Sequence, residues 1–335
     1  MSLPGQTDWG FAALASILTA LTLWALSRFA ARLPHAEPGP RSLHHRAIPR
    51  VGGIAVWIGF LPSALLAPPA VPGRWPIWLA GLGIIAAVSL FDDWRGLHPL
   101  YRLAAHFLAA ALVAQSLMES NVTAVPAWLA GSFVAIMLVW SANLYNFMDG
   151  SDGLAGAMGV CGFGAYAFAA ATVGSDAACY LSLAAASLAF LAVNVPPARV
   201  FMGDVGAVPM GFLAAASGLG GWRLGLWPAW FPLLVFLPFL ADATLTLAKR
   251  LVHRERVWEA HKSHYYQRVL QMGAGHGGTL VLFLGLMLAT GGSALAALTM
   301  VPELGWTLLA AWCAGFGALF AGIDYHWKHR APISR

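Results

Sequence analysis

Residues 125–155 read VPAWLAGSFVAIMLVWSANLYNFMDGSDGLA, an apolar run that ends in a series of amides and carboxylates. The part from 125 to 143 is long enough to cross about 30 Å of hydrocarbon as a helix. Similar runs occur near 10–33, 51–69, 76–91, 99–118, 153–173, 177–195, 206–220, 228–248, 277–297 and 305–323. The sequence therefore predicts an all-α, polytopic helical membrane protein with about eleven transmembrane helices.

The composition supports this fold class. Hydrophobic residues make up 59% of the chain, charged residues only 10%, and the mean hydropathy is +0.69, which excludes an ordinary soluble protein. A β-barrel is disfavoured because its strands would give alternating segments of about ten residues instead of continuous apolar runs. The three cysteines fall inside apolar runs, so we expect neither a disulfide nor a cysteine metal site. Residues 1–335 are interpreted as one integral-membrane domain.

The basic residues predict the orientation of the chain. With the N-terminus outside, the inner loops fall near 34–50, 92–98, 144–152, 196–205 and 249–276. Only Arg74 and Arg223 among the 19 Lys and Arg residues then lie on or near the outer side. Because cytoplasmic loops carry an excess of Lys and Arg, we expect an N-out, C-in topology. This topology explains the net charge of +5 without a nucleic-acid partner. The inner loops also carry nearly all of the acids, amides and histidines that could perform chemistry, which predicts an active site on the cytoplasmic face.

Four polar residues recur every third position at the end of the run described first. Asn143, Asn146, Asp149 and Asp152 follow this spacing, so neighbouring pairs share one helix face. Their amide and carboxylate oxygens suit a hard divalent cation such as Mg²⁺. The alternative is an Asp and Gly turn in which Asp152 caps the next helix.

Further acids lie at the inner ends of other runs. Asp92 and Asp93 are adjacent, and because they repel each other they require a cation, a proton or full hydration. Asp204 stands between Gly203 and Gly206, where it would add another oxygen ligand for Mg²⁺. A solvated helix end for the pair and a helix cap for Asp204 are the structural alternatives.

Basic residues gather in two inner loops. The first carries Arg41, His44, His45, Arg46 and Arg50, and the longest carries Arg250, His253, Arg254, Arg256, His261, Lys262, His264 and Arg268. Each cluster could anchor lipid headgroups. Carboxylates that bind a metal, beside Arg and His residues that bind anions, are typical of sites that bind a pyrophosphate. A zinc site is disfavoured, since neither a cysteine nor a close third histidine accompanies the pair at 261 and 264.

Asp242 differs from the other acids because it lies inside the run 228–248. A charged side chain within a membrane is costly and therefore marks a candidate functional site. A structural hydrogen bond to a neighbouring helix explains the residue equally well.

The segments described above, taken together, resemble the polyprenyl-phosphate N-acetylhexosamine-1-phosphate transferases. The matching motifs are RSLH (41–44), IPRVGG (48–53), FDD (91–93), NLYNFMDGSDGLA (143–155), FMGDVG (201–206) and AHKSHYYQR (260–268). The last motif is most similar to the branch that starts bacterial O-antigen and other surface polysaccharides. The branch that acts in peptidoglycan synthesis carries a run of adjacent histidines at this place.

The resemblance implies a reaction in the bacterial inner membrane. A sugar 1-phosphate would pass from a UDP-N-acetylhexosamine, such as UDP-GlcNAc or a related UDP-N-acetyl-deoxyhexosamine, to undecaprenyl phosphate with release of UMP. Asn146 and Asp204 would hold Mg²⁺, with Mn²⁺ as an alternative cation. Asp92 and Asp93 would orient or deprotonate the lipid phosphate and, with Asp204, form the catalytic set.

The resemblance also implies substrate-binding residues. Asp149 and Asp152 would line the nucleotide site, and His261, His264 and Arg268 would contact the pyrophosphate or the sugar. His44, Arg50 and Asn143 complete the candidate set.

Other functions stay open as alternatives. One is the phospho-N-acetylmuramoyl-pentapeptide transferase of peptidoglycan synthesis. Another is a transporter of an anionic solute, which predicts polar residues near the bilayer midplane, whereas here they gather at one edge. A different Mg²⁺-dependent membrane enzyme would use another Asp pattern. A homodimer is a further expectation.

Overall fold

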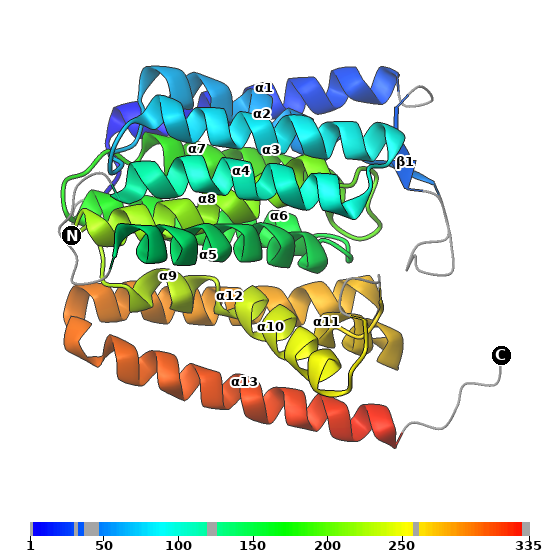
Figure 1. The fold of residues 1–335 in the computed structure, drawn as a ribbon. Helices are drawn as coiled ribbons and strands as arrows, with labels where there is room; N and C mark the ends of the chain where they lie inside the picture. The colour runs from blue at the N-terminus through cyan, green and yellow to red at the C-terminus, as the bar shows by residue number, and fades with distance from the viewer. Residues whose placement is uncertain (1–2, 30–32, 37–46, 119–125, 257–260, 330–335) are drawn as a thin grey trace.

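The computed structural model describes residues 3–29, 33–36, 47–118, 126–256 and 261–329. Within this part of the chain the fold is a helical bundle with one short two-stranded sheet (Figure 1). The elements are α1 (Gln6–Arg28), β1 (His35–Ala36), β2 (Ile48–Pro49), α2 (Gly52–Leu66), α3 (Trp75–Arg95), α4 (Pro99–Met118), α5 (Ala127–Met148), α6 (Leu154–Thr172), α7 (Ala178–Asn194), α8 (Asp204–Arg223), α9 (Trp230–Val235), α10 (Leu237–Val252), α11 (Tyr265–Val269), the π-helical turn η2 (Leu270–Ala274), α12 (Gly275–Met300), the short 3-10 helix η3 (Pro302–Leu304) and α13 (Gly305–Lys328). The prediction of an all-α, polytopic membrane protein is confirmed.

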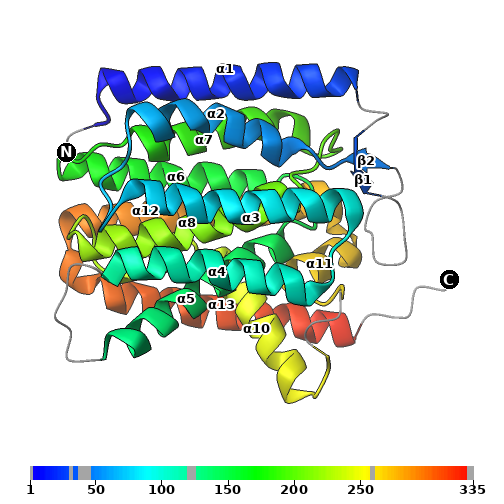
Figure 2. The ribbon, with the colours of Figure 1, turned by 45° about the horizontal axis from the view of Figure 1, so that its top comes forward.

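Most helices of the bundle run side by side along one axis (Figure 2). Among the described residues, eight helices are long and apolar enough to cross a membrane, while α2 and α7 are shorter apolar helices. The helix α1 begins at one end of the bundle and α13 ends at the other (Figure 1). The number of spans and the N-out, C-in orientation stay predictions.

The centre of the bundle is formed by α6 and α8, in which 78% and 83% of the most apolar window is buried. Both helices are rich in Gly and Ala, and small residues allow helix backbones to approach closely. A Cβ atom on Gly211 would lie 2.4 Å from the carbonyl oxygen of Ser141, which shows how closely α8 approaches α5. The Ser141 hydroxyl donates a hydrogen bond to the Gly211 carbonyl at 2.8 Å and joins the same two helices.

The helices α3 and α5 extend into the segments that were predicted as the loops 92–98 and 144–152. Asp92 and Asp93 lie in the last turn of α3, and α5 continues through Asn146 to Met148, so these polar residues are helical instead of lying in loops. The length of an apolar run is set by the thickness of the hydrocarbon. A helix can continue beyond that run, because its backbone hydrogen bonds do not require apolar side chains. The carboxylates therefore stand on rigid elements.

The predicted ninth span, 228–248, is not one helix. It is broken at Phe236 into α9 and α10, and Pro238 lies in the first turn of α10, where its missing N–H is tolerated. Both views show α10 inclined to the other helices (Figures 1 and 2). Its far end thereby leaves the bundle beside α11.

Two segments far apart in the sequence are joined by their backbones. The N–H of Gly53 donates to the Met202 carbonyl at 2.8 Å, and the N–H of Gly52 donates to the Phe201 carbonyl at 2.9 Å. A Cβ atom on Gly53 would lie 2.3 Å from the Cα atom of Gly206. This approach requires glycine and places the start of α2 against the start of α8.

We predict that Gly53→Ala destabilises the protein, because neither backbone can move without losing these hydrogen bonds. The cost expected for overpacking is about 1–3 kcal/mol, measured as a lower melting temperature in detergent. Gly83→Ala in α3 is the matched control, since a Cβ atom there meets nothing within 4 Å. Equal melting temperatures for the two variants would contradict the assignment.

Candidate active site

Four carboxylates from three separate parts of the chain meet at one end of the bundle. Asp92 and Asp93 come from α3, Asp149 follows α5, and Asp204 is the first residue of α8. We call these four residues the carboxylate cluster. The Arg102 guanidinium, from the first turns of α4, donates to Asp92 Oδ2 and lies 3.3 Å from Asp204 Oδ2.

Asp93 joins α3 to α8. Its Oδ2 atom accepts the N–H of Val205 at 3.0 Å, and its Oδ1 atom lies 4.0 Å from the Arg50 guanidinium. The Oδ1 atom of Asp92 accepts the N–H of Leu97 at 2.6 Å, which fixes the turn between α3 and α4. Each member of the adjacent pair is thus oriented by a different segment.

When its carboxylates are ionised, the cluster carries an excess of negative charge. Burial raises the pKa of Asp149 well above its usual range; Asp204 and Asp93 raise it further, while Arg50 opposes them. Four carboxylates interact electrostatically with two guanidinium groups, those of Arg50 and Arg102. A divalent cation would neutralise the remaining charge.

The oxygen donors of the cluster suit Mg²⁺ better than a metal ion that is held entirely by protein side chains. Among the described residues, no three His, Cys, Asp or Glu side chains are placed to hold a metal ion. Mg²⁺ commonly takes only one or two protein carboxylates and completes its shell with water and substrate phosphates. Asn146 lies in the last turn of α5 and makes no side-chain hydrogen bond to any described residue. One or two carboxylates of the cluster could therefore hold a Mg²⁺ ion whose other ligands come from water and a phosphorylated substrate.

Two other members of the polar series have partners within the protein. The Asn143 side-chain amide donates to the Val139 carbonyl at 2.7 Å, and its oxygen accepts no hydrogen bond from the residues that the structure describes. Asp152 is only 4% exposed, and its Oδ2 atom accepts the N–H of Ala198 at 2.9 Å. The alternative interpretation, in which Asp152 is the N-cap of the next helix, is wrong. Gly153 is the N-cap residue of α6, with a φ angle of 82°. The predicted roles of Asn143 and Asp152 in substrate binding stay predictions.

Asn194 and Arg102 are site residues that sequence reasoning missed. Asn194, at the end of α7, is 2% exposed; it accepts the N–H of Gly153 at 2.9 Å and donates to the Val200 carbonyl at 2.8 Å. It thereby connects the segment after Asp149 to the segment before Asp204. In the sequence, Asn194 is only a single amide at the end of an apolar run, and Arg102 is only a single arginine ten residues after Asp92. Neither belongs to a motif that would have indicated a site residue.

The buried Asp242 has a structural explanation. It is fully buried, and its two oxygens accept the N–H groups of Tyr265 and Tyr266 at 2.9 and 2.8 Å. The His264 ring nitrogen Nδ1 lies 3.2 Å from the same carboxylate. A carboxylate at a helix N-terminus satisfies free N–H groups and is favoured by the helix dipole. Asp242 therefore anchors the start of α11.

The basic residues of the last motif separate into two places. The rings of His261 and His264 stack with centroids 4.7 Å apart, and His264 stacks on Phe147 of α5 at 5.9 Å. Burial, His264 and Arg250 lower the pKa of His261 to about 4, so it is neutral at pH 7. Arg268 instead pairs with Asp324 of α13. His44, with Arg41, His45 and Arg46, lies outside the described residues.

Comparison with known proteins agrees with the motifs. The model of glycosyl transferase family 4 matches residues 75–221, from α3 to α8. A probable undecaprenyl-phosphate N-acetylglucosaminyl 1-phosphate transferase from Bacillus subtilis is 26% identical over 277 residues, which cover 78% of this chain and 77% of that protein. A decaprenyl-phosphate N-acetylglucosaminephosphotransferase from Mycolicibacterium smegmatis is 30% identical over 285 residues, covering 72% of this chain and 70% of that protein.

A second kind of relative is matched over a shorter region. The phospho-N-acetylmuramoyl-pentapeptide-transferase of Shouchella clausii is 32% identical over 208 residues, which cover 54% of this chain and 63% of that protein. The chain belongs to the polyprenyl-phosphate N-acetylhexosamine-1-phosphate transferases of glycosyl transferase family 4. It is a phospho-sugar transferase and a multi-pass protein of the bacterial inner membrane.

We predict that Asn194→Leu destabilises the protein, because it leaves the buried Gly153 N–H and the partly buried Val200 carbonyl without their partner. Orphaning the buried N–H alone costs about 1–3 kcal/mol. Thermal unfolding in detergent would measure the loss. Gln115→Leu, at an exposed position of α4, is the control and should melt like the wild type. A stable Asn194→Leu protein would show that this amide does not hold the two segments.

Proposed function

We propose that the protein transfers N-acetylglucosamine 1-phosphate, or a closely related N-acetylhexosamine 1-phosphate, from its UDP derivative to undecaprenyl phosphate. The products are an undecaprenyl-pyrophosphate-linked sugar and UMP. The observation that carries the proposal is the carboxylate cluster with Arg50 and Arg102 at the ends of membrane helices. The similarity to N-acetylglucosamine 1-phosphate transferases over more than two thirds of the chain supports the donor.

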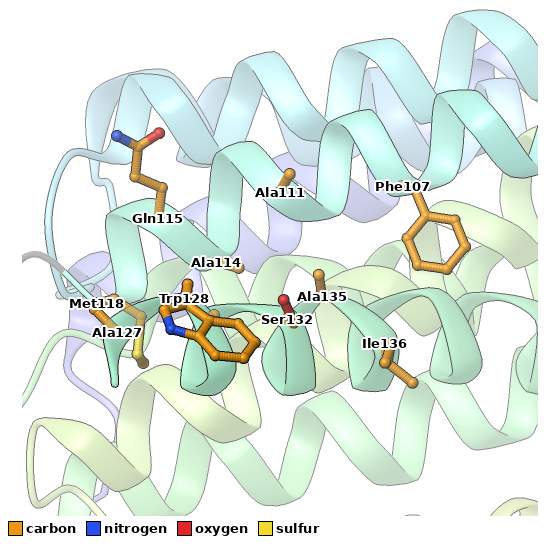
Figure 3. Close-up of a pocket in the computed structure, with 11 residues that line it drawn as sticks. Phe107, Ala111, Ala114, Gln115, Met118, Ala127, Trp128, Ser132, Ala135 and Ile136 are labelled. Atoms are coloured by element: carbon orange, nitrogen blue, oxygen red, sulfur yellow. The ribbon is translucent and has the colours of Figure 1, made fainter. Parts of the chain in front are cut away.

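An apolar groove along the same helix that carries Arg102 supports a lipid acceptor. It has a volume of about 710 Å³, lies between α4 and α5, and is lined by residues such as Phe107, Ala111, Trp128 and Ile136 (Figure 3). Phe107 follows Arg102 by five residues, which is about 7.5 Å along a helix. The same helix thus presents a guanidinium group to a phosphate and an apolar wall to a polyprenyl chain.

The proposed reaction is a displacement at phosphorus. An oxygen of the lipid phosphate attacks the sugar-bearing phosphorus of the donor, the bond from that phosphorus to the bridging oxygen breaks, and UMP leaves with the electron pair. Asp92 and Asp93 orient the lipid phosphate or remove its proton, and Arg50 and Arg102 offset its charge. Asn146 and Asp204 would hold Mg²⁺, which neutralises charge on the pyrophosphate. His261 and His264, stacked beside the end of α5, would supply hydrogen bonds to the donor.

The relatives also inform the choice of pathway. The muramoyl-pentapeptide transferase of Shouchella clausii covers 54% of the chain, against 78% for the Bacillus subtilis relative. This difference supports an N-acetylglucosamine donor over the peptidoglycan precursor. We infer that the enzyme catalyses the first membrane step of O-antigen or another surface polysaccharide, with its active site on the cytoplasmic face.

The direct test is transfer by the purified protein. With undecaprenyl phosphate, Mg²⁺ and a panel of UDP-sugars, we expect UMP release and a labelled lipid with UDP-GlcNAc or a related N-acetylated donor. UDP-N-acetylmuramoyl-pentapeptide should give no product. Release of UMP only from the pentapeptide donor would support the peptidoglycan alternative, and no release from any donor would contradict the proposed reaction.

We predict that activity requires a divalent cation held by Asp204. EDTA should abolish transfer, and Mg²⁺ or Mn²⁺ should restore it. Asp204→Asn should lower kcat about 100-fold or more, because a lost metal ligand removes several kcal/mol of charge stabilisation. Glu303→Gln, an exposed acid next to α13, is the matched control and should retain activity. Full activity in EDTA would contradict the metal assignment.

A further inference from the structure

The carboxylate of Asp324 binds positive charges from two other helices. Lys249 of α10 donates to its Oδ2 atom, and Arg268 of α11 donates to its Oδ1 atom. The side chains of Asp324 and Arg268 are 21% and 17% exposed, so solvent screens the pair only in part. This carboxylate near the end of α13 therefore connects three helices by charge.

The ring of Tyr265 lies within the same contact. It stacks on Phe320, one turn before Asp324 on α13, with ring centroids 4.0 Å apart and planes 10° apart. Its hydroxyl donates to Asp324 Oδ2 at 3.2 Å, and the cationic groups of Lys249 and Arg268 each lie 5.1 Å from the ring centroid. Because Phe320 and Asp324 are four residues apart, one face of α13 makes both contacts.

The other side of α11 faces the candidate active site. The Tyr266 hydroxyl donates to the Phe147 carbonyl at 2.9 Å, and the His264 ring stacks on the Phe147 ring. The helix α11 has only five residues and continues through the π-helical turn η2 (Leu270–Ala274) into α12. Besides α12, its position depends on Asp242 at its start, α5 on one side and Asp324 on the other.

The helix α13 is held at its far end by other contacts. The Trp312 ring N–H donates to the Ser293 hydroxyl of α12 at 3.0 Å, and Gly305 packs against the Trp230 ring. A change at Asp324 therefore leaves α13 in the bundle and acts on α11.

We propose that Asp324 is a positioning residue, which holds α11 through Lys249 and Arg268 so that His264 stays against Phe147 with His261 stacked on it. The kinetic part of this inference rests on the proposed function. It also gives Arg268 a different role from the one implied by its motif, because its guanidinium acts through Asp324 and not on the pyrophosphate.

The test compares Asp324→Asn with Glu303→Gln in the full-length protein. We expect Asp324→Asn to raise the KM for UDP-GlcNAc about tenfold and to leave the KM for undecaprenyl phosphate within about twofold, because in the proposed function His261 and His264 at the start of α11 bind the donor and not the lipid. Asp324→Glu should recover part of the loss. Hydrogen exchange in residues 261–272 should become faster in Asp324→Asn and stay unchanged in Glu303→Gln. Unchanged donor KM and unchanged exchange in Asp324→Asn would overturn the proposal.

A double-mutant cycle tests the role of Arg268. If Arg268 acts through Asp324, Arg268→Met should raise the donor KM in the wild type but have little further effect in Asp324→Asn. Equal effects in both backgrounds would contradict this role. Tyr265→Phe, which removes only the hydroxyl, is a milder variant and should shift KM and exchange in the same direction as Asp324→Asn. The exchange measurement needs no substrate, so a protein without transfer activity would contradict the proposed function and leave the positioning role to be judged by exchange.

Discussion

The site depends on the contact between the backbone segments at 50–53 and 201–206. Because Gly53 and Gly206 have no side chains, the segments approach closely enough to exchange backbone hydrogen bonds. The contact brings Arg50 within 4.0 Å of Asp93 and places the start of α8 against the end of α3. Asp93 then accepts the Val205 N–H at the positive end of the α8 dipole. Without this contact, Arg50 and the Val205 N–H would no longer offset the charge of Asp93, and Arg102 alone would oppose the mutual repulsion of the four carboxylates.

The fold class was predictable because hydrocarbon imposes one requirement. Every backbone polar group inside it must be paired, so long apolar runs can only be helices. The helix ends were less predictable, since polar residues such as Asp92 and Asn146 continue a helix beyond its apolar run. The break at Phe236 was missed for a related reason: hydropathy does not distinguish a straight apolar helix from two inclined pieces.

The carboxylates of the site were predictable from their spacing and their position at one membrane edge. Their partners were not, because each comes from another helix and has no local pattern around it. Arg102 appears as one basic residue at the start of a span, and Asn194 as one amide at the end of another. The sequence alone does not show whether Asp242 is a functional or a structural residue, because the N–H groups of α11 that it accepts come from another part of the chain. Tertiary pairing decides whether such a residue performs chemistry or holds the structure.

The proposed function requires two substrates of opposite character. A nucleotide sugar would come from water and a polyprenyl phosphate from the bilayer, so their phosphates would meet at the membrane boundary. The helices α3 and α5 carry their acids and amides just beyond the apolar runs. The helix α4 extends from Arg102 along the groove wall. A single rigid helix can thus fix the distance between a charged head and an apolar tail, and this spacing, more than any one side chain, would select a lipid phosphate over a soluble one.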